Sequence, residues 1–336
     1  MSNKVVRILF YVLPFPIIII SLFVGASQQA GFVDYVILLY KKYIALNLTN
    51  VEEQELNIAN NIIFNIRLPR VLLTFMIGSA LSSSGVVLQA VLRNPLVDSY
   101  ILGISSAAAF GAALAMFLGW YINLLAFIMG AVAVITTFLI AKGREGASIV
   151  SVVLSGMIIS GMFTALLSVV QYLANPYQLS AIVQWTMGNL HAATWAEVQQ
   201  SYIPIIIGIV GIYLFRWRLN LLALGDVAAK SVGVNPLFDK VFLITMVTLM
   251  TATSVAVAGI ISMYGLFLPH IVRMILGADN KEVVKGSIFF GGAFLLIIDN
   301  ISRSLFEFEV PIGIFTMIIG GLFFIYLMKK NKLSWS

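Results

Sequence analysis

Residues 148–170 read SIVSVVLSGMIISGMFTALLSVV, a run of 23 residues without a charged side chain. A helix needs about 20 mostly apolar residues to cross the hydrocarbon core of a bilayer. A surface helix of a water-soluble domain would keep charged residues on one face, and this run has none. The run therefore predicts a membrane-spanning helix.

The composition of the whole chain agrees with this prediction. Of its 336 residues, 60% are apolar and 10% are charged, and the mean hydropathy is +1.01. Soluble domains carry about 25% charged residues, so a water-soluble enzyme is excluded. The chain has no cysteine, which excludes disulfides and thiolate metal sites, and its two histidines offer little for a metal centre. A net charge of +6 is typical of basic cytoplasmic loops and gives no reason to expect nucleic acid as a partner.

Ten apolar runs follow one another along the sequence, and we predict an all-α integral membrane protein with one transmembrane domain, residues 1–336. The predicted spans are residues 8–26, 70–91, 101–119, 121–141, 148–170, 201–215, 238–258, 265–276, 285–301 and 311–328. An even number of spans puts both termini on one side. With the termini inside, fifteen of the twenty Lys and Arg residues fall on inner segments and five on outer ones. This positive-inside bias predicts cytoplasmic termini in a cell membrane, surrounded by lipid.

Small residues recur at helical spacing within several spans, as close helix packing in lipid requires. Such stripes are most often contacts between helices. The stripe of Gly156, Ser160 and Thr164 is rich in hydroxyl groups, so we consider it the best candidate for lining a translocation path.

Few ionisable residues lie within the spans. Asp299 is the main one, and Arg303 follows one helical turn later, where the two side chains can form an ion pair. No chain of buried acids and histidines suggests proton or sodium coupling, which weakens the reading as a secondary transporter. The phosphate-binding pattern G-x-x-x-x-G-K-[ST] is absent, so any ATP must be hydrolysed by a separate subunit.

Five short motifs are more specific than hydropathy. They are RLPR at residues 67–70, QAVLRNPL at 89–96, LGDVAAKSVGV at 224–234, PHIVR at 269–273 and EVPIG at 309–313. Together, in this order and in register with ten spans, they resemble the FecCD family of ABC importer permeases, the type II importers that include vitamin B12 permeases. The resemblance extends from Arg67 to Leu327.

The resemblance implies the type II ABC importer permease fold and a homodimer with a translocation path on its two-fold axis. It also implies two cytoplasmic ATPase subunits, which hold ATP and Mg²⁺, and an extracytoplasmic solute-binding protein. This chain would itself carry no cofactor and catalyse no reaction. Residues 223–234 look like the coupling helix that contacts the ATPase, through Gly225, Asp226, Ala229, Lys230, Ser231 and Gly233.

Three cations at the ends of predicted outer segments suit carboxylates on a docking protein: Arg67, Arg70 and Arg303. The other motif residues are assigned structural roles: Gln89, Arg93, Asn94, Pro95, Pro269, His270, Arg273, Asp299, Glu309, Pro311 and Gly313. For His270 we weigh a metal ligand against a structural hydrogen bond, and the lack of a second ligand favours the hydrogen bond.

We expect a permease for ferric-siderophore chelates, the commonest cargo of the family. Haem, cobalamin and molybdate are the alternatives within the same importer type. An ion-coupled secondary transporter is the alternative from another class, and it would depend on protonation of Asp299.

Overall fold

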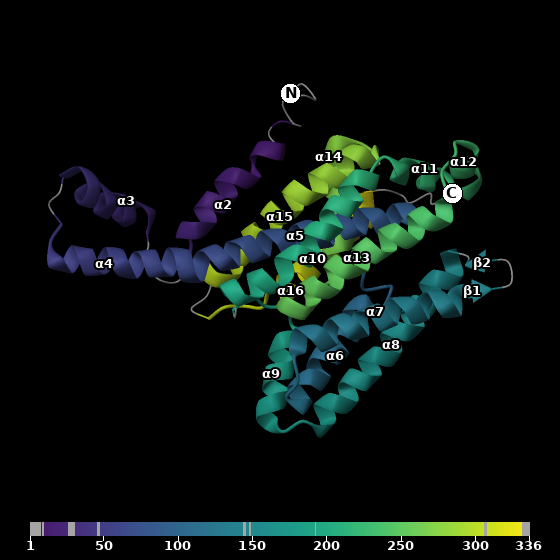
Figure 1. Ribbon diagram of the computed structural model, residues 1–336, viewed down its shortest axis with the longest axis horizontal. Helices are drawn as coiled ribbons and strands as arrows, with labels where there is room; N and C mark the ends of the chain where they lie inside the picture. The colour runs from purple at the N-terminus through teal and green to yellow at the C-terminus, as the bar shows by residue number, and fades with distance from the viewer. Residues whose placement is uncertain are drawn as a thin grey trace.

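The computed structural model describes residues 8, 10–25, 31–45, 48–143, 146–147, 149–191, 193–305 and 308–330, and nearly all of them are helical (Figure 1). The α-helices are α2 (Pro14–Phe23), α3 (Phe32–Tyr40), α4 (Asn50–Asn61), α5 (Leu68–Val91), α6 (Ile104–Leu118), α7 (Ile122–Ala141), α8 (Ile149–Leu173), α9 (Pro176–Thr186), α10 (Trp195–Phe215), α11 (Arg218–Leu224), α12 (Asp226–Ser231), α13 (Pro236–Ala258), α14 (Tyr264–Leu276), α15 (Asn280–Ser304) and α16 (Ile312–Lys330). Two π-helical segments, η2 (Lys41–Ala45) and η3 (Ile62–Arg67), adjoin α3 and α5, and the two-residue strands β1 (Lys142–Gly143) and β2 (Gly146–Ala147) form an antiparallel pair.

The helices confirm the predicted spans. Among the described residues, seven helices are long and apolar enough to cross a membrane, and three shorter apolar helices, residues 10–23, 104–118 and 264–276, correspond to the remaining predicted runs. The second span differs most, because α4, η3 and α5 form one continuous helical segment from Asn50 to Val91. In Figure 1, α4 extends α5 beyond the other helices, with α3 beside it.

Local capping chemistry explains where many of these helices begin. Thr49, Asn175 and Thr194 each accept a backbone hydrogen bond in a capping box at the start of α4, α9 and α10. Asn235 caps α13, whose first residue is Pro236, a position that needs no N–H donor.

Helix α5 is the central element. It packs against α10, α13, α14 and α15, and 20 of its 24 residues are buried. Its glycines allow backbones to meet: a Cβ added to Gly85 would lie 1.8 Å from the carbonyl oxygen of Gly265 in α14, and one on Gly78 would lie 2.5 Å from that of Gly291 in α15. Close backbone contact of this kind replaces the hydrophobic driving force that lipid cannot supply.

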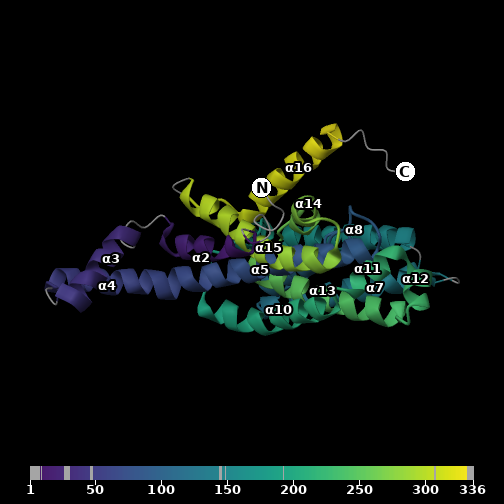
Figure 2. The same ribbon diagram turned by 90° about the horizontal axis from the view of Figure 1, so that it is seen from above.

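The two faces of the bundle differ. Figure 2 shows α16 on one side and α10 and α13 on the opposite side of α5. The stripe predicted on the fifth span is divided between two environments. Gly156 and Ser160 are buried against the segment that leads into α6 and against α6 itself, and Ser160 Oγ lies 2.6 Å from Ser106 Oγ, whereas Thr164 is exposed.

Candidate functional site

A buried charge cluster joins three segments that are far apart in the sequence. Arg70, in the first turn of α5, donates to Asp299 Oδ1 of α15 from Nε (3.1 Å) and Nη2 (2.8 Å). Its Nη1 donates to both oxygens of Glu309, which precedes α16, at 3.1 and 2.8 Å. The second oxygen of Asp299 lies 3.4 Å from Nε of Arg303, so the predicted pair with Arg303 is present. Asp299 and Glu309 thus supply two carboxylates for the guanidinium groups of Arg70 and Arg303, as buried charges require.

Arg67 and Arg303 also hold the end of α2. Arg67 Nη1 donates to the carbonyl of Leu22 at 3.1 Å, and Arg303 Nη2 donates to that of Ser21 at 2.7 Å. The last carbonyls of a helix have no intrahelical partner and carry the negative end of its dipole, so cations stabilise them.

These three arginines are buried rather than exposed to solvent. The exposed fractions of Arg67, Arg70 and Arg303 are 4%, 8% and 4%. The structure does bring the three together, but each is turned into the protein and bonded to α2, α15 or the segment before α16. Their role in docking a binding protein stays a prediction.

His191 also belongs to this cluster, although no motif in the sequence pointed to it. Its Nδ1 lies 2.5 Å from Glu309 Oε2, across 118 residues of chain. The His191 contact and the Arg70 guanidinium lower the pKa of Glu309 to about 2. Glu309 is partly exposed, and with His191 it forms the accessible rim of the cluster.

The predicted coupling segment lies at the other end of α5. A Cβ on Gly225 would lie 3.1 Å from Nη1 of Arg93, which follows the last turn of α5. Arg70 and Arg93 are 23 residues apart, which is about 35 Å along a helix, close to the thickness of the hydrocarbon core. The charge cluster and the coupling segment therefore lie at opposite membrane boundaries (Figure 1).

Helix α12 is a short, well-terminated element of this segment. Val234 N–H donates to the carbonyl of Ala229 and Gly233 N–H to that of Lys230, with Gly233 at φ +81°. This is a Schellman motif, in which Gly233 is the left-handed residue that ends the helix. Lys240 holds Asp226 with two hydrogen bonds of 2.6 and 2.8 Å.

The side chains of α12 divide into buried and exposed sets. Ala229 is fully buried and cannot reach a partner, whereas Lys230 and Ser231 are exposed. Exposed apolar side chains surround them, with Val227 at 85% and Leu224 at 73% exposure.

The motif at residues 89–96 forms the end of α5. Asn94 N–H donates to the carbonyl of Gln89, and Arg93 N–H to that of Ala90, a second Schellman motif. Arg93 takes φ +46°, unusual for a residue with a side chain, and Pro95 follows, where the helix cannot continue. Asn94 Oδ1 accepts from Leu96 N–H at 3.0 Å.

The motif at residues 269–273 ties α14 to α5. Gln89 Nε2 donates to the carbonyl of Leu266 at 3.3 Å and accepts at Oε1 from Arg273. His270 Nδ1 lies 3.0 Å from the same carbonyl, and Pro269 lies within the helix. The structural hydrogen bond expected for His270 is therefore confirmed. Among the described residues, no group of three or more His, Cys, Asp or Glu side chains could hold a metal ion.

The motif at residues 309–313 passes close to the backbone of residues 187–188, just after α9. Gly313 N–H donates to the carbonyl of Gly188 at 3.3 Å, and a Cβ on Gly313 would lie 2.2 Å from the carbonyl of Met187. Pro311 precedes the first residue of α16. Only glycine allows this crossing between the end of α9 and the start of α16.

Known proteins resemble the chain over nearly its full length. Residues 12–330 match the model of the FecCD transport family. An iron chelatin transport system permease protein of Helicobacter pylori is 36% identical over 86% of this chain and 89% of its own length. The molybdate import permease MolB of Haemophilus influenzae is 35% identical over 88% and 87%, and the hemin permease HmuU of Yersinia pestis is 34% identical over 80% and 83%.

The fold agrees with this assignment. A solved metal-chelate type ABC transporter in an inward-facing conformation superimposes with a TM-score of 0.82 at 31% identity, over 98% of this chain and 100% of the other. The chain therefore belongs to the FecCD transport family and is a multi-pass membrane permease of a type II ABC importer.

Proposed function

We propose that two copies of this chain form the membrane channel of an importer for ferric-siderophore chelates. The relatives' names cover iron chelate, molybdate and haem, so the choice depends on the chemistry of the exposed surface. The observation that carries the proposal is the apolar, methionine-bearing face of α8 and α16.

No charged residue occurs in α8, nor in α16 before Lys329. Their exposed side chains include Met157 at 59%, Met162 at 57% and Met317 at 55%. Flexible thioethers adapt to large, irregular ligands. A small oxyanion such as molybdate would need cationic or multiple N–H donors, which this surface does not offer.

The same faces support the homodimer. Helices α8 and α16 expose most of their length, and two such faces around a two-fold axis would enclose a path. We place Thr164, which is exposed, on this path. Gly156 and Ser160 instead pack α8 against α6 and the segment that leads into it.

The partners bind at the two ends of α5. A cytoplasmic ATPase subunit, which holds ATP and Mg²⁺, contacts α12 through the exposed Val227, Lys230 and Ser231. A solute-binding protein docks at the boundary where His191 and Glu309 are accessible, and Arg67, Arg70 and Arg303 fix the helices beneath that surface.

Uptake into proteoliposomes tests the cargo. The chain is reconstituted with its ATPase, and binding protein loaded with labelled ferric siderophore, haem, cobalamin or molybdate is added. We expect ATP-dependent uptake of the ferric siderophore above the other three. Preferred uptake of molybdate would overturn the proposal. Uptake without ATPase that a protonophore abolishes would establish the secondary transporter, which the pairing of Asp299 with two arginines already disfavours.

A pair of variants tests the path. Thr164→Trp adds bulk on the exposed face and should block uptake while the protein still purifies as a dimer. Ser160→Trp adds the same bulk against Ser106 and should lower thermal stability instead. Normal uptake by Thr164→Trp would exclude this face as the path.

A further inference from the structure

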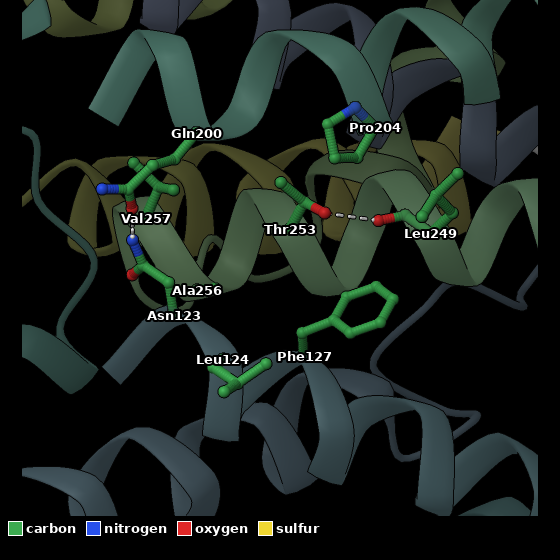
Figure 3. A pocket seen from close by; sticks show the side chains of 9 residues that line it. All are labelled: Asn123, Leu124, Phe127, Gln200, Pro204, Leu249, Thr253, Ala256 and Val257. Atoms are coloured by element: carbon green, nitrogen blue, oxygen red, sulfur yellow. Dashed lines mark hydrogen bonds between the residues drawn. The ribbon is translucent and has the colours of Figure 1, made fainter. Parts of the chain in front are cut away.

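A cavity of about 240 Å³ lies between α7, α10 and α13 (Figure 3). Its walls are mostly apolar: Leu124 and Phe127 of α7, Pro204 of α10, and Leu249, Ala256 and Val257 of α13. Its polar groups are Asn123, Gln200 and Thr253. In Figure 3, α10 and α7 form opposite walls, with α13 between them.

The amide groups sit at one end of the cavity. Asn123 Nδ2 donates to Gln200 Oε1 at 2.5 Å. Asn123 is the second residue of α7, and Gln200 is in the second turn of α10, whose first residue, Trp195, donates to the carbonyl of Phe64 beside Arg67. The amide end is therefore at the membrane boundary that carries the charge cluster.

The apolar part of the cavity extends from this boundary into the membrane. Val257 and Leu249 are eight residues apart on α13, or about 12 Å along the helix axis. One leaflet of hydrocarbon is about 15 Å deep. The cavity thus extends from this boundary through most of the depth of one leaflet.

Pro204 adds a further polar feature near the amides. It has no N–H, so the carbonyl of Gln200 cannot receive the usual α-helical hydrogen bond from residue 204. A hydroxyl or ammonium donor entering beside Gln200 would find an acceptor there, and the amide N–H groups can donate to an ester carbonyl.

We propose that this cavity binds a single phospholipid, with the first part of one acyl chain between the three helices and its glycerol ester region at Asn123 and Gln200. The surroundings favour lipid over another occupant. Leu124, which lines the cavity, is 60% exposed, so the cavity opens onto a surface that faces hydrocarbon. It also lies on the side of α5 away from α16, where our proposed dimer contact would not cover it (Figure 2).

Water is a poorer occupant of the deep part. A buried water needs two to four polar partners, but the two amide groups lie at one end and the hydroxyl of Thr253 already donates to the carbonyl of Leu249. An empty cavity would deprive its lining of contact atoms. An acyl chain fills the apolar part and leaves the polar end for groups that can form hydrogen bonds.

Native mass spectrometry can test the site. The protein is reconstituted in vesicles of phosphatidylethanolamine and phosphatidylglycerol, extracted in mild detergent, and the phospholipids retained per chain are counted as the collision energy rises. We expect one phospholipid to remain after the others dissociate. Val257→Phe fills the cavity and should weaken retention about tenfold, or about 1.4 kcal/mol. Val210→Phe makes the same change on an exposed part of α10 outside the cavity and should retain the lipid.

Further variants separate the contributions. Leu124→Trp also fills the cavity. Because Leu124 is 60% exposed, this variant should fold even if Val257→Phe does not. Asn123→Leu with Gln200→Leu removes the amides and should lower retention without filling the cavity. Equal retention by the wild type, Leu124→Trp and Val257→Phe would overturn the proposal, as would a water-filled cavity in an experimental structure in lipid.

Discussion

Asp299 is fully buried and is paired with both Arg70 and Arg303, so its loss should disturb the charge cluster strongly. Asp299→Asn would leave these guanidinium groups with Glu309 as their remaining counter-charge. Removing one partner of a buried ion pair costs about 3–5 kcal/mol. We expect a loss of that size, measured by chemical unfolding in detergent. Glu53→Gln, a change to an exposed acid on α4, is the control and should leave stability unchanged.

Charge reversal at Arg67 or Arg303 should destabilise the fold. Both side chains are buried and donate to carbonyls of α2, so a carboxylate at either position would place an acceptor where those carbonyls need a donor. Loss of folded protein is the expected result, and docking is better measured with changes at the accessible His191.

Asp98 makes a specific prediction about pH. It lies between α5 and α6, and Tyr100 and Ile101 donate backbone hydrogen bonds to its Oδ1 at 3.0 and 3.2 Å. Desolvation raises its pKa to about 6, against 3.8 for an unperturbed Asp, although these two hydrogen bonds act in the opposite direction. The folded state therefore binds more protons between these values, and this residue's contribution to stability falls as pH rises from about 4 through about 6.

Asp98→Asn keeps the acceptor oxygen and removes the charge. The variant should be more stable than the wild type above pH 6, by about 1–3 kcal/mol, and the difference should vanish below about pH 4. Unfolding free energies across this pH range measure the difference. A constant difference between Asp98→Asn and wild type at every pH would contradict the prediction.

Glu309 acts in a lower pH range and with the opposite sign. Its depressed pKa adds stability that is lost as pH falls from about 4.5 to about 2.

At the scale of the element, burial decides which side chains of α12 can contact a partner protein. Its six residues are anchored by Lys240 on Asp226 and closed by the turn at Gly233. The helix is too short to be stable alone, so its position depends on these anchors. Contact with an ATPase must then come from its exposed residues.

Val227→Asp and Ala229→Asp should accordingly have different effects. Val227 is 85% exposed, so a charge there should leave the fold intact and reduce ATP-driven uptake and ATPase stimulation. Ala229 is fully buried, so the same charge should lower thermal stability. Uptake, ATPase rate and melting temperature measured on both variants distinguish the two outcomes. Full coupling in Val227→Asp would exclude α12 as the contact.

At the scale of the whole molecule, the absence of cysteine from the sequence allows orientation to be measured directly. Val227→Cys and Tyr177→Cys place single thiols at 85% and 90% exposed positions, near opposite membrane boundaries. Tyr177 is at the start of α9, where Gln178 donates to the carbonyl of Phe117 near the end of α6. If the termini are cytoplasmic, a membrane-impermeant maleimide should label Tyr177→Cys in intact cells and Val227→Cys only in inverted vesicles. The reverse pattern would invert the topology.

The amino-acid sequence by itself determined the spans, the family and several helix ends. Hydrophobic runs are local, since each must match the bilayer thickness, and all ten coincide with apolar helices. The end of α12 at Gly233 was predictable for the same reason, because a left-handed residue closes a helix through bonds to its own last turn.

Only the tertiary structure decided which charges are paired and which faces are covered. Arg70 meets Glu309 across 239 residues, and Arg303 reaches the end of α2 across 282. The pattern of residues showed that these arginines lie at span ends, but not whether they point outward or inward. Likewise, spacing put Gly156, Ser160 and Thr164 in one stripe, while the position of α6 buried two of them. Periodicity defines the faces of a single helix, whereas burial and ion pairing depend on which neighbouring helices cover those faces.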